Sequence, residues 1–407
     1  MEHKSQPNYN YLMMAGHVVC DMNQSTVPAL LPFLVLGRGI DYAAAAGLMF
    51  ASSFLSSLIQ PLLGMLSDRK QFPWLMGVGI LMTGIGIASI GFLEHYWAIF
   101  AAVMFSGMGS AVFHPEGGRM ANRLAGEKKG RGMSTFQAGG SLGFVIGPML
   151  AVFAVTTWGL RGTAIFLVPT LTMVAILFAM QSRFMRAASP INPPPGSQAD
   201  PSAAVDDWPS LRKLCISIFS RSIVMNGLLT FIPLYWVGIL LQSQQQGSLM
   251  LTAMALAGTA AAFTGGILAD RFGFSRVIRL TFVFIPLLML LLPFTSHLWL
   301  AVALTVSLAA LINLGHSPAI VLGQKYLPNR LGMASGITLG LAVSVGGVFS
   351  PLMGRIGDTF GLSSVFYVLA GVALLGALGT FLVKDPPVAK PAEAAPAETP
   401  QPLTSER

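Results

Sequence analysis

Charged residues are scarce in this chain. Only 10% of its 407 residues are charged, whereas 54% are hydrophobic; ordinary soluble domains carry about 25% charged residues. A water-soluble protein of this length could not hide so much apolar surface in one core, because its outer surface would have to face water. The composition therefore excludes a soluble globular protein and favours one that is surrounded by a lipid bilayer.

Cysteines and catalytic motifs are scarce too. Cys20 and Cys215 both lie in apolar segments, so we expect no disulfide framework. The sequence has no phosphate-binding loop, no H-E-x-x-H metal-binding spacing and no nucleophile–base motif. We therefore expect no enzyme activity, no cofactor and no metal centre. The net charge of +8 does not indicate nucleic-acid binding, because the basic residues lie in short loops between apolar segments.

The chain does have long apolar segments. Stretches of about 20 such residues cross a bilayer as helices. The sequence predicts an all-α polytopic membrane protein with twelve spans at residues 11–37, 43–66, 74–93, 97–123, 133–157, 161–181, 211–241, 247–269, 277–294, 298–324, 331–353 and 362–383.

One polar connection, rich in Pro, Ser and Asp, divides the spans six and six. Its composition is typical of a flexible linker, and the low-complexity C-terminus is typical of a disordered tail. We therefore predict an N-terminal half, a cytoplasmic linker, a C-terminal half and a disordered cytoplasmic tail at residues 1–181, 182–210, 211–383 and 384–407.

The basic residues are distributed unevenly between the two sides of the predicted spans. If both termini are cytoplasmic, only Arg38, Arg161 and Arg355 of the 24 Lys and Arg lie outside, and Arg221 lies within a span. The opposite orientation would place nearly all the others outside. The positive-inside rule therefore predicts cytoplasmic termini.

The two halves share a loop motif, G-x-L-x-D-R, after the second and eighth spans. Its key residues are Gly64, Asp68, Arg69, Gly266, Asp270 and Arg271. A glycine allows two helices to approach closely, and an aspartate can accept hydrogen bonds from the N-terminus of a neighbouring helix. We expect these loops to form a conformational latch. The alternative is that their basic residues only anchor the topology.

Two parallel six-span repeats joined by these paired loops resemble the major facilitator superfamily. The resemblance extends over residues 10–385, although the first loop departs from the usual pattern at Gln71, Phe72 and Pro73. It implies two six-helix bundles around a central cavity that is lined by the first, fourth, seventh and tenth spans. It also implies transport by alternating access.

Ionisable residues that lie well inside the predicted spans all belong to those four spans. Each charge at the bilayer centre costs roughly 2.5–3.5 kcal/mol, so such residues usually face a cavity or a partner. They are His17, Asp21, His114, Glu116, Arg221 and His316. Polar residues on the same spans are candidate substrate ligands together with Arg221 and His316, and they are Asn23, Gln24, Asn226, Tyr235 and Asn313.

Asp21 is the leading candidate to carry protons, and His17, His114 and Glu116 are further candidates for proton coupling. Asp21 lies about 12–15 Å from the membrane surface at 1.5 Å per residue. An unpaired carboxylate at that depth takes up a proton near neutral pH. His17 lies four residues earlier and so shares the same helix face.

Other roles remain open for three of these residues. Arg221 is either the counter-ion of Asp21 or the anchor for an anionic substrate. Glu116 can instead form a structural pair with Arg119 or Arg123, and His316 can be a hydrogen-bonded histidine near a helix end.

The fifth span has glycines on one face. Gly139, Gly143 and Gly147 are spaced four residues apart, and Pro148 follows them. Such a face allows close helix contact, and the proline can add a bend. The run resembles the glycine-rich motif that is associated with antiporters in the superfamily, while ordinary packing is the alternative.

Three segments narrow the resemblance to the fosmidomycin-resistance branch. They are residues 16–25, the element F-H-P-E-x-x-R at 113–119, and residues 134–140, which add Gln137 to the candidate substrate ligands. This branch implies proton-driven efflux across the bacterial inner membrane. Fosmidomycin is a phosphonate, and Arg221 with several histidines would suit its anionic head group.

We therefore predict a proton-coupled exporter of a small anionic or amphipathic compound. Its partners are the substrate, protons and the lipid bilayer, and we expect a monomer. The alternative function is proton-coupled uptake of a small metabolite, which would use the same residues.

Overall fold

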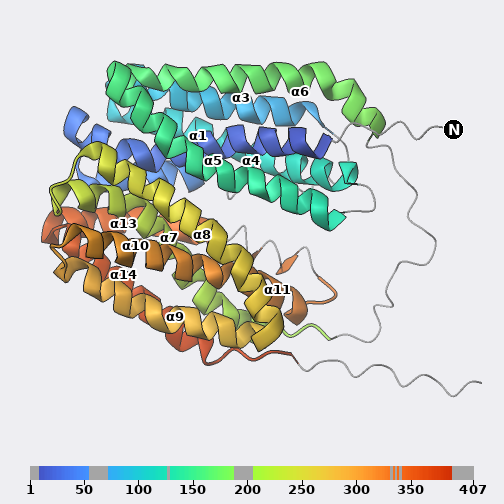
Figure 1. The fold of residues 1–407 in the computed structure, drawn as a ribbon, viewed down its shortest axis with the longest axis vertical. Coiled ribbons are helices and arrows are strands. Elements are labelled where there is room, and N and C mark those ends of the chain that lie inside the picture. The colour runs from blue at the N-terminus through green and yellow to red at the C-terminus, as the bar shows by residue number, and fades with distance from the viewer. Residues whose placement is uncertain are drawn as a thin grey trace, which may run out of the picture.

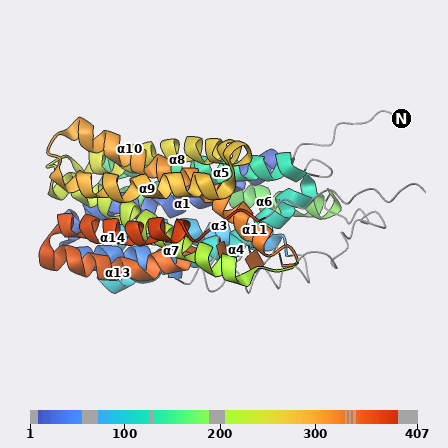
Figure 2. The same cartoon turned by 90° about the horizontal axis from the view of Figure 1, so that it is seen from below.

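The computed structural model describes residues 9–54, 72–125, 129–187, 205–330, 333–334, 337–338 and 342–386. In these residues all regular secondary structure is helical. The helices form two bundles that lie side by side, one from each half of the chain (Figure 1), and they run along a common direction (Figure 2). This confirms the predicted all-α fold with two halves.

The described helices of the N-terminal half are α1 (Tyr9–Arg38), Tyr42–Phe54, α3 (Trp74–Ser89), η1 (Ile90–Phe92), α4 (Tyr96–Leu124), α5 (Lys129–Trp158), η2 (Gly159–Phe166) and α6 (Leu167–Ala187). Those of the C-terminal half are α7 (Trp208–Gly238), α8 (Gln244–Phe272), α9 (Phe274–Leu291), η4 (Leu292–Phe294), α10 (Leu298–Leu314), α11 (His316–Tyr326), α13 (Ala342–Phe360) and α14 (Leu362–Thr380).

Ten of the predicted spans are helical at the predicted places to within a few residues. The second span is described only to Phe54, and the eleventh mainly from Ala342 onward. Within the described residues, nine helical stretches are long and apolar enough to cross a membrane, and one of them, Arg131–Phe184, contains both the fifth and the sixth spans. The tenth span differs from the prediction, because it breaks at Gly315 into α10 and α11.

The glycine face of α5 packs directly against α1. A Cβ atom on Gly139, Gly143 or Gly147 would lie 2.4, 2.7 or 2.4 Å from a backbone oxygen of α1. These distances are too short for any side chain, so only glycine permits the observed separation of the two helices. The packing fixes the position of α1, which carries most of the candidate site.

The two halves contact each other toward the end of the bundle where α1 finishes at Arg38, which we call the sealed end. There the Ser248 hydroxyl donates to the Ala29 backbone oxygen at 2.7 Å, and the Asp358 carboxylate accepts from the backbone N–H groups of Tyr42 and Ala43 at 2.8 and 2.9 Å. The Asp358 contact caps the helix Tyr42–Phe54 with a side chain from the opposite half.

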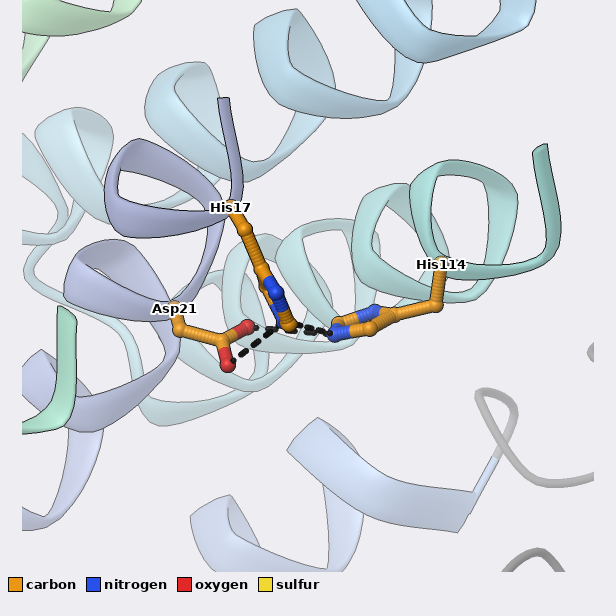
Figure 3. A group of neighbouring side chains, drawn as sticks. All are labelled: His17, Asp21 and His114. Atoms are coloured by element: carbon orange, nitrogen blue, oxygen red, sulfur yellow. Dashed lines mark hydrogen bonds and ion pairs between the residues drawn. The ribbon is translucent and has the colours of Figure 1, made fainter. Parts of the chain in front are cut away.

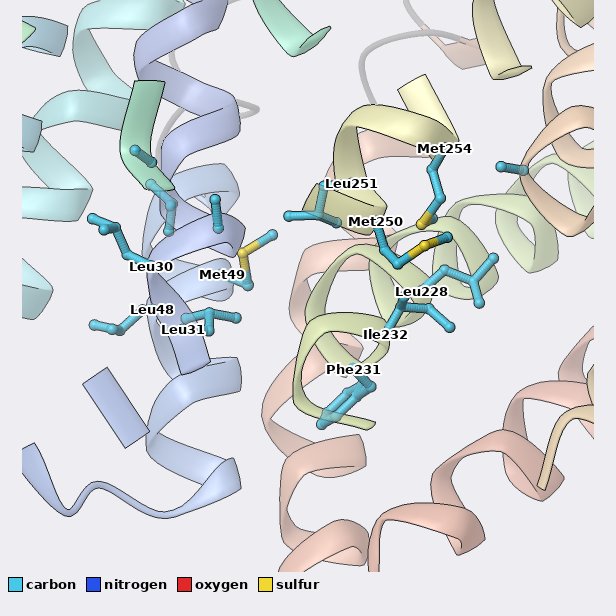
Figure 4. Close-up of a cluster of buried hydrophobic side chains, with 14 of the residues drawn as sticks. Leu30, Leu31, Leu48, Met49, Leu228, Phe231, Ile232, Met250, Leu251 and Met254 are labelled. Atoms are coloured by element: carbon cyan, nitrogen blue, oxygen red, sulfur yellow. The ribbon is translucent and has the colours of Figure 1, made fainter. Parts of the chain in front are cut away.

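Apolar side chains from both halves also meet at this boundary (Figure 4). The N-terminal half contributes Leu30, Leu31, Leu48 and Met49, and the C-terminal half contributes Leu228, Phe231, Ile232, Met250, Leu251 and Met254. All belong to one buried cluster. Burial of these side chains stabilises the contact between the halves.

The predicted latch after the eighth span looks different in the structure. Gly265 makes the close approach, because its Cβ would lie 2.0 Å from the Leu314 backbone oxygen, whereas a Cβ on Gly266 would have nothing within 4 Å. Neighbouring residues on a helix face different sides, so the motif glycine is turned away from α10. Asp270 is exposed and accepts no hydrogen bond from the described residues.

Arg271 is exposed as well, and its guanidinium lies 5.4 Å from the centre of the Phe272 ring. The matching residues of the first loop, Gly64, Asp68 and Arg69, lie outside the described residues. The latch therefore stays a prediction for both loops, and among the described residues the second loop makes no such contact.

Residues at the described edges of the predicted linker and tail make specific contacts. Asp206 pairs with Arg330 at 3.2 Å just before α7 begins. The Asp385 carboxylate accepts from the backbone N–H and the hydroxyl of Ser275 at 3.0 and 2.8 Å, and so it caps α9. The described part of the predicted tail is residues 384–386, and 188–204 and 387–407 lie outside the described residues, so the predicted linker and tail stay predictions.

The Asp358 contact leads to a testable prediction about the sealed end. Asp358→Ala should increase the labelling of a reporter cysteine introduced by Met49→Cys, because the bond between the halves is lost. Asp41→Ala is the matched control, since Asp41 caps the same helix from within its own half by accepting from the Ala44 N–H at 2.7 Å. Each change should cost about 1 kcal/mol as the loss of a helix cap. Equal labelling in the two variants would contradict a role for Asp358 in closure.

Candidate functional site

Three ionisable side chains meet between α1 and α4 (Figure 3). His17 and Asp21 lie one turn apart on α1, and His114 reaches them from α4. The His17 Nε2 atom lies 3.2 Å from Asp21 Oδ2, and the His114 Nε2 atom lies 3.2 Å from Asp21 Oδ1. The two Nε2 atoms are 3.2 Å apart. We call this cluster the triad.

Backbone carbonyl groups fix the orientation of both imidazole rings. The Nδ1 atom of His17 lies 2.8 Å from the Phe136 oxygen, and the Nδ1 atom of His114 lies 2.9 Å from the Ser110 oxygen. A carbonyl oxygen can only accept a hydrogen bond, so we assign the ring proton of each neutral imidazole to Nδ1. The Ser110 hydroxyl, 3.1 Å from His114 Nδ1, then accepts from the same N–H. In the neutral form of either ring, Nε2 is then a bare acceptor that points at the other two members of the triad.

This geometry requires a proton within the triad. Without one, two imidazole lone pairs and a carboxylate would face one another at hydrogen-bonding distance with no donor among them. A single shared proton supplies the donor and makes the net charge of the triad zero. The arrangement can therefore bind one proton and share it among the two Nε2 atoms and the Asp21 carboxylate. It can also release the proton, but the lone pairs that remain then repel one another.

The triad is enclosed on most sides but not on all. The side chains of His17 and Asp21 are 4% and 10% exposed, whereas that of His114 is 30% exposed. His17 stacks on Phe136 with the ring centres 4.1 Å apart, and Gly140 lies directly against the His17–Asp21 pair. His114 is therefore the most exposed member of the triad.

Glu116 does not join the triad. Its carboxylate is fully buried and is paired with the guanidinium of Arg119, one turn further along α4. This is the structural alternative that the sequence left open. The pair neutralises the glutamate locally, which is how a buried carboxylate is usually accommodated.

Arg221 is the counterpart of the triad in the C-terminal half. Only 9% of its surface is exposed, yet it forms no hydrogen bond and no ion pair with any residue that the structure describes. The two histidines occupy both oxygens of Asp21, so in this conformation Arg221 is not its counter-ion. His316 is the first residue of α11 and belongs to the same half of the chain.

Two predicted substrate ligands on α1 have partners inside their own half. The Asn23 amide is fully buried and donates to the Val19 oxygen at 2.9 Å and to the hydroxyls of Thr83 and Thr170 at 3.4 and 3.3 Å. These bonds pack α1 against α3 and α6. Gln24 donates to the Ser106 oxygen of α4 at 3.1 Å, and its own oxygen accepts from Ser52.

The remaining predicted ligands are dispersed. Tyr235 is fully buried, and its hydroxyl donates to the Leu292 oxygen at 3.1 Å. Asn226 and Asn313 are half-buried, and each donates to a carbonyl one turn earlier on its own helix. Gln137 is exposed on α5. None of these four residues contacts the triad among the contacts that the structure describes.

Sequence reasoning overlooked several residues that build the site. Ser110 and Phe136 orient the histidines through backbone oxygens, which no residue type can reveal. Gly140 was visible as part of the glycine run, but its contact with the triad depends on how α5 is rotated. Away from the site, sequence reasoning also overlooked Asp358 at the sealed end. It follows Gly354 and Gly357, and glycines at that spacing indicate a close contact between helices.

Comparison with known proteins gives matches over nearly the whole chain. The sequence matches the family described as Major Facilitator Superfamily twice, over residues 13–242 and 214–406. The fosmidomycin resistance protein of Escherichia coli (strain K12) is 29% identical over 376 residues, which cover 90% of each chain. The multidrug resistance protein of Proteus mirabilis (strain HI4320) is 24% identical over 389 residues, covering 91% of this chain and 94% of that protein.

A solved structure supports the fold. The D-xylose–proton symporter superposes with a TM-score of 0.73 at 14% sequence identity, covering 93% of this chain and 98% of that one. At that identity the likeness concerns the fold alone. Together the matches confirm the resemblance that the loop motifs and the F-H-P-E-x-x-R element predicted.

The close contact of Gly140 gives a prediction for the site. A Cβ there would lie 2.7 Å from His17 Nε2 and 2.8 Å from Asp21 Oδ2, so Gly140→Ala should displace both side chains and cost about 1–3 kcal/mol as overpacking. Gly371→Ala is the control, because nothing lies within 4 Å of that position. Thermal unfolding in detergent would measure the difference. Equal stability of the two variants would contradict the packing described here.

Proposed function

Because this chain belongs to the Major Facilitator Superfamily and is a multi-pass membrane transporter, we propose that it exports a small anionic or amphipathic compound in exchange for protons. We place it in the bacterial inner membrane with both termini in the cytoplasm, acting as a monomer. The similarity to proteins named for fosmidomycin and multidrug resistance supports export.

The triad is the observation that carries the proposal. It needs a proton to be stable, it is buried in the membrane-spanning part of the chain, and it has one partly exposed member. Asp21 and the two histidines are therefore the proposed proton site. Glu116 is set aside from this role because its charge is already neutralised by Arg119.

Arg221 supports an anionic substrate. A buried guanidinium without a partner is costly, and a bound anion would supply the missing charge and hydrogen bonds. Guanidinium binds carboxylate and phosphonate groups through two parallel hydrogen bonds, which suits such head groups. We propose that Arg221 anchors the substrate and that His316 lies beside it.

The two charged sites lie on different halves, which suggests how coupling works. When the substrate anion occupies Arg221 and the triad gives up its proton, the interior holds one new negative charge at each site. Movement of the halves against each other then exposes both sites to the other side, where the substrate leaves and the triad takes up a proton. The glycine face of α5 keeps α1 and the triad rigid during this movement.

The energy available is sufficient for efflux without ATP. One proton that crosses about 150 mV releases roughly 3.5 kcal/mol, since 100 mV is worth about 2.3 kcal/mol per charge. That supports a concentration gradient of about a few hundredfold. The alternative is proton-coupled uptake of a small metabolite, and the fold, which is shared with a D-xylose–proton symporter, suits either direction.

A first prediction concerns the proton site. Asp21→Asn should abolish substrate-induced proton release in everted vesicles while leaving insertion intact, because the amide keeps the shape but cannot titrate. Glu116→Gln should keep coupling, since that carboxylate serves the pair with Arg119. Normal coupling in the Asp21 variant, or its loss only in the Glu116 variant, would overturn the assignment.

A second prediction concerns Arg221. Equilibrium binding of fosmidomycin to the purified protein should weaken about 10–150-fold in Arg221→Gln, because a charge-assisted hydrogen bond contributes about 1.5–3 kcal/mol. Arg221→Lys should retain part of the affinity, since it keeps the charge but not the forked geometry. Arg355→Gln, at the sealed end, is the control. Unchanged affinity in Arg221→Gln, or no binding by the unaltered protein, would contradict the anion site.

A further inference from the structure

We propose that the triad is also a binding site for a divalent transition-metal ion such as Zn²⁺. The sequence indicated no metal centre, because no short metal-binding spacing occurs in it. The structure brings three potential ligands together from positions that are far apart in the chain. One ligand atom each from His17, Asp21 and His114 lies within 4.8 Å of the other two.

The separations of the ligand atoms match the coordination sphere of zinc. The Nε2 atoms lie 3.2 Å from each other, and each lies 3.2 Å from a carboxylate oxygen of Asp21. Ligands placed about 2.0–2.1 Å from a tetrahedral Zn²⁺ are about 3.3–3.4 Å apart. Each Nε2 atom faces a different oxygen of Asp21. A small rotation of the carboxylate would bring one oxygen and both nitrogens to the corners of one face of a tetrahedron around the ion.

The surroundings of the two imidazoles are those of metal ligands. Each ring donates from Nδ1 to a backbone oxygen, of Phe136 for His17 and of Ser110 for His114. Histidines that ligate metals characteristically donate their other ring nitrogen in this way, which fixes the tautomer and aims the lone pair of Nε2 at the ion. The stacking of His17 on Phe136 restricts the ring further.

The negative charge of Asp21 and the partial exposure of His114 also favour binding of a cation at the triad. Asp21 supplies a negative charge in a buried place, and the described residues provide no Lys or Arg partner for it. His114 is 30% exposed on its side chain, which leaves an open side for a fourth ligand such as water. Two imidazoles and one carboxylate select Zn²⁺, Co²⁺ or Ni²⁺ over Ca²⁺ and Mg²⁺, which prefer oxygen ligands.

A metal ion in the triad would occupy all three atoms that the proposed function assigns to the proton. Bound Zn²⁺ would therefore inhibit proton-coupled transport. This consequence rests on the proposed function, whereas binding of the ion does not. The two claims can be tested separately.

The test measures Zn²⁺ binding to the purified full-length protein in detergent, by competition with a colorimetric chelator. We expect one saturable site, which Ca²⁺ does not compete for, and Co²⁺ in its place should give the visible absorption bands of a four-coordinate ion. Asp21→Asn and His114→Ala should each weaken binding by at least about 100-fold, the upper end of the loss caused by removing even an outer-shell partner. His297→Ala, an exposed histidine at the sealed end, should bind normally.

The outcomes decide between the two claims. No saturable binding, equal competition by Ca²⁺, or unchanged affinity in the triad variants would overturn the metal site and leave proton coupling untouched. Saturable binding that leaves transport in vesicles unaffected would uphold the metal site and contradict the assignment of protons to the triad. Correct folding of each variant is checked by its elution as a single species in size-exclusion chromatography.

Discussion

The structure depends on the close packing of α5 against α1. Three glycines on one face of α5 bring the helices so near that a Cβ atom would collide with the backbone of α1. The same contact places the Phe136 oxygen beside His17 and Gly140 beside Asp21, so it sets the ring and the carboxylate before α4 adds His114. The acceptor groups of the triad are then forced together, and only a proton or another cation relieves their repulsion.

The charges divide between the halves of the molecule. The N-terminal half holds the carboxylate and two histidines, and the C-terminal half holds Arg221, which is buried and has no partner in the described part of the chain. A direct ion pair between Asp21 and Arg221 would neutralise both charges. Neither residue would then need a bound substrate or a proton to balance its charge. In the proposed function, separate sites keep each charge dependent on a ligand, and the halves that carry them are joined by contacts at the sealed end.

The fold was largely predictable from the sequence, because apolar segments of membrane-spanning length are an unambiguous signal. The site was predictable in part. His17, Asp21 and His114 could be selected as ionisable residues in spans, and the spacing of His17 and Asp21 placed them on one helix face. Their meeting with His114 could not be predicted, since it depends on the rotation of α4 against α1.

Residues whose roles depend on helix rotation were the ones predicted least well. Asn23 packs between helices of its own half, and Gly266 faces away from α10 while its neighbour Gly265 makes the contact. Successive residues of an α-helix point in directions about 100° apart. Composition and spacing do not specify how a helix is rotated about its axis, so they do not show which of two neighbouring residues makes a contact. The tenth span breaks at Gly315, and here the sequence did carry a signal that the prediction overlooked. Pro318 has no N–H to donate to the Leu314 oxygen, so a continuous helix is disfavoured at this point.

The central claim is that the triad shares one proton between two imidazoles whose Nδ1 atoms both donate to the backbone. Nitrogen NMR of the protein with ¹⁵N-labelled histidine tests it most directly, with His17→Gln and His114→Gln used to assign the signals. The account predicts that His17 and His114 both carry Nδ1–H at neutral pH, with a single further proton distributed over their Nε2 atoms and Asp21. A bare Nδ1 on either ring, or two Nε2 atoms that are each fully protonated at neutral pH, would contradict it.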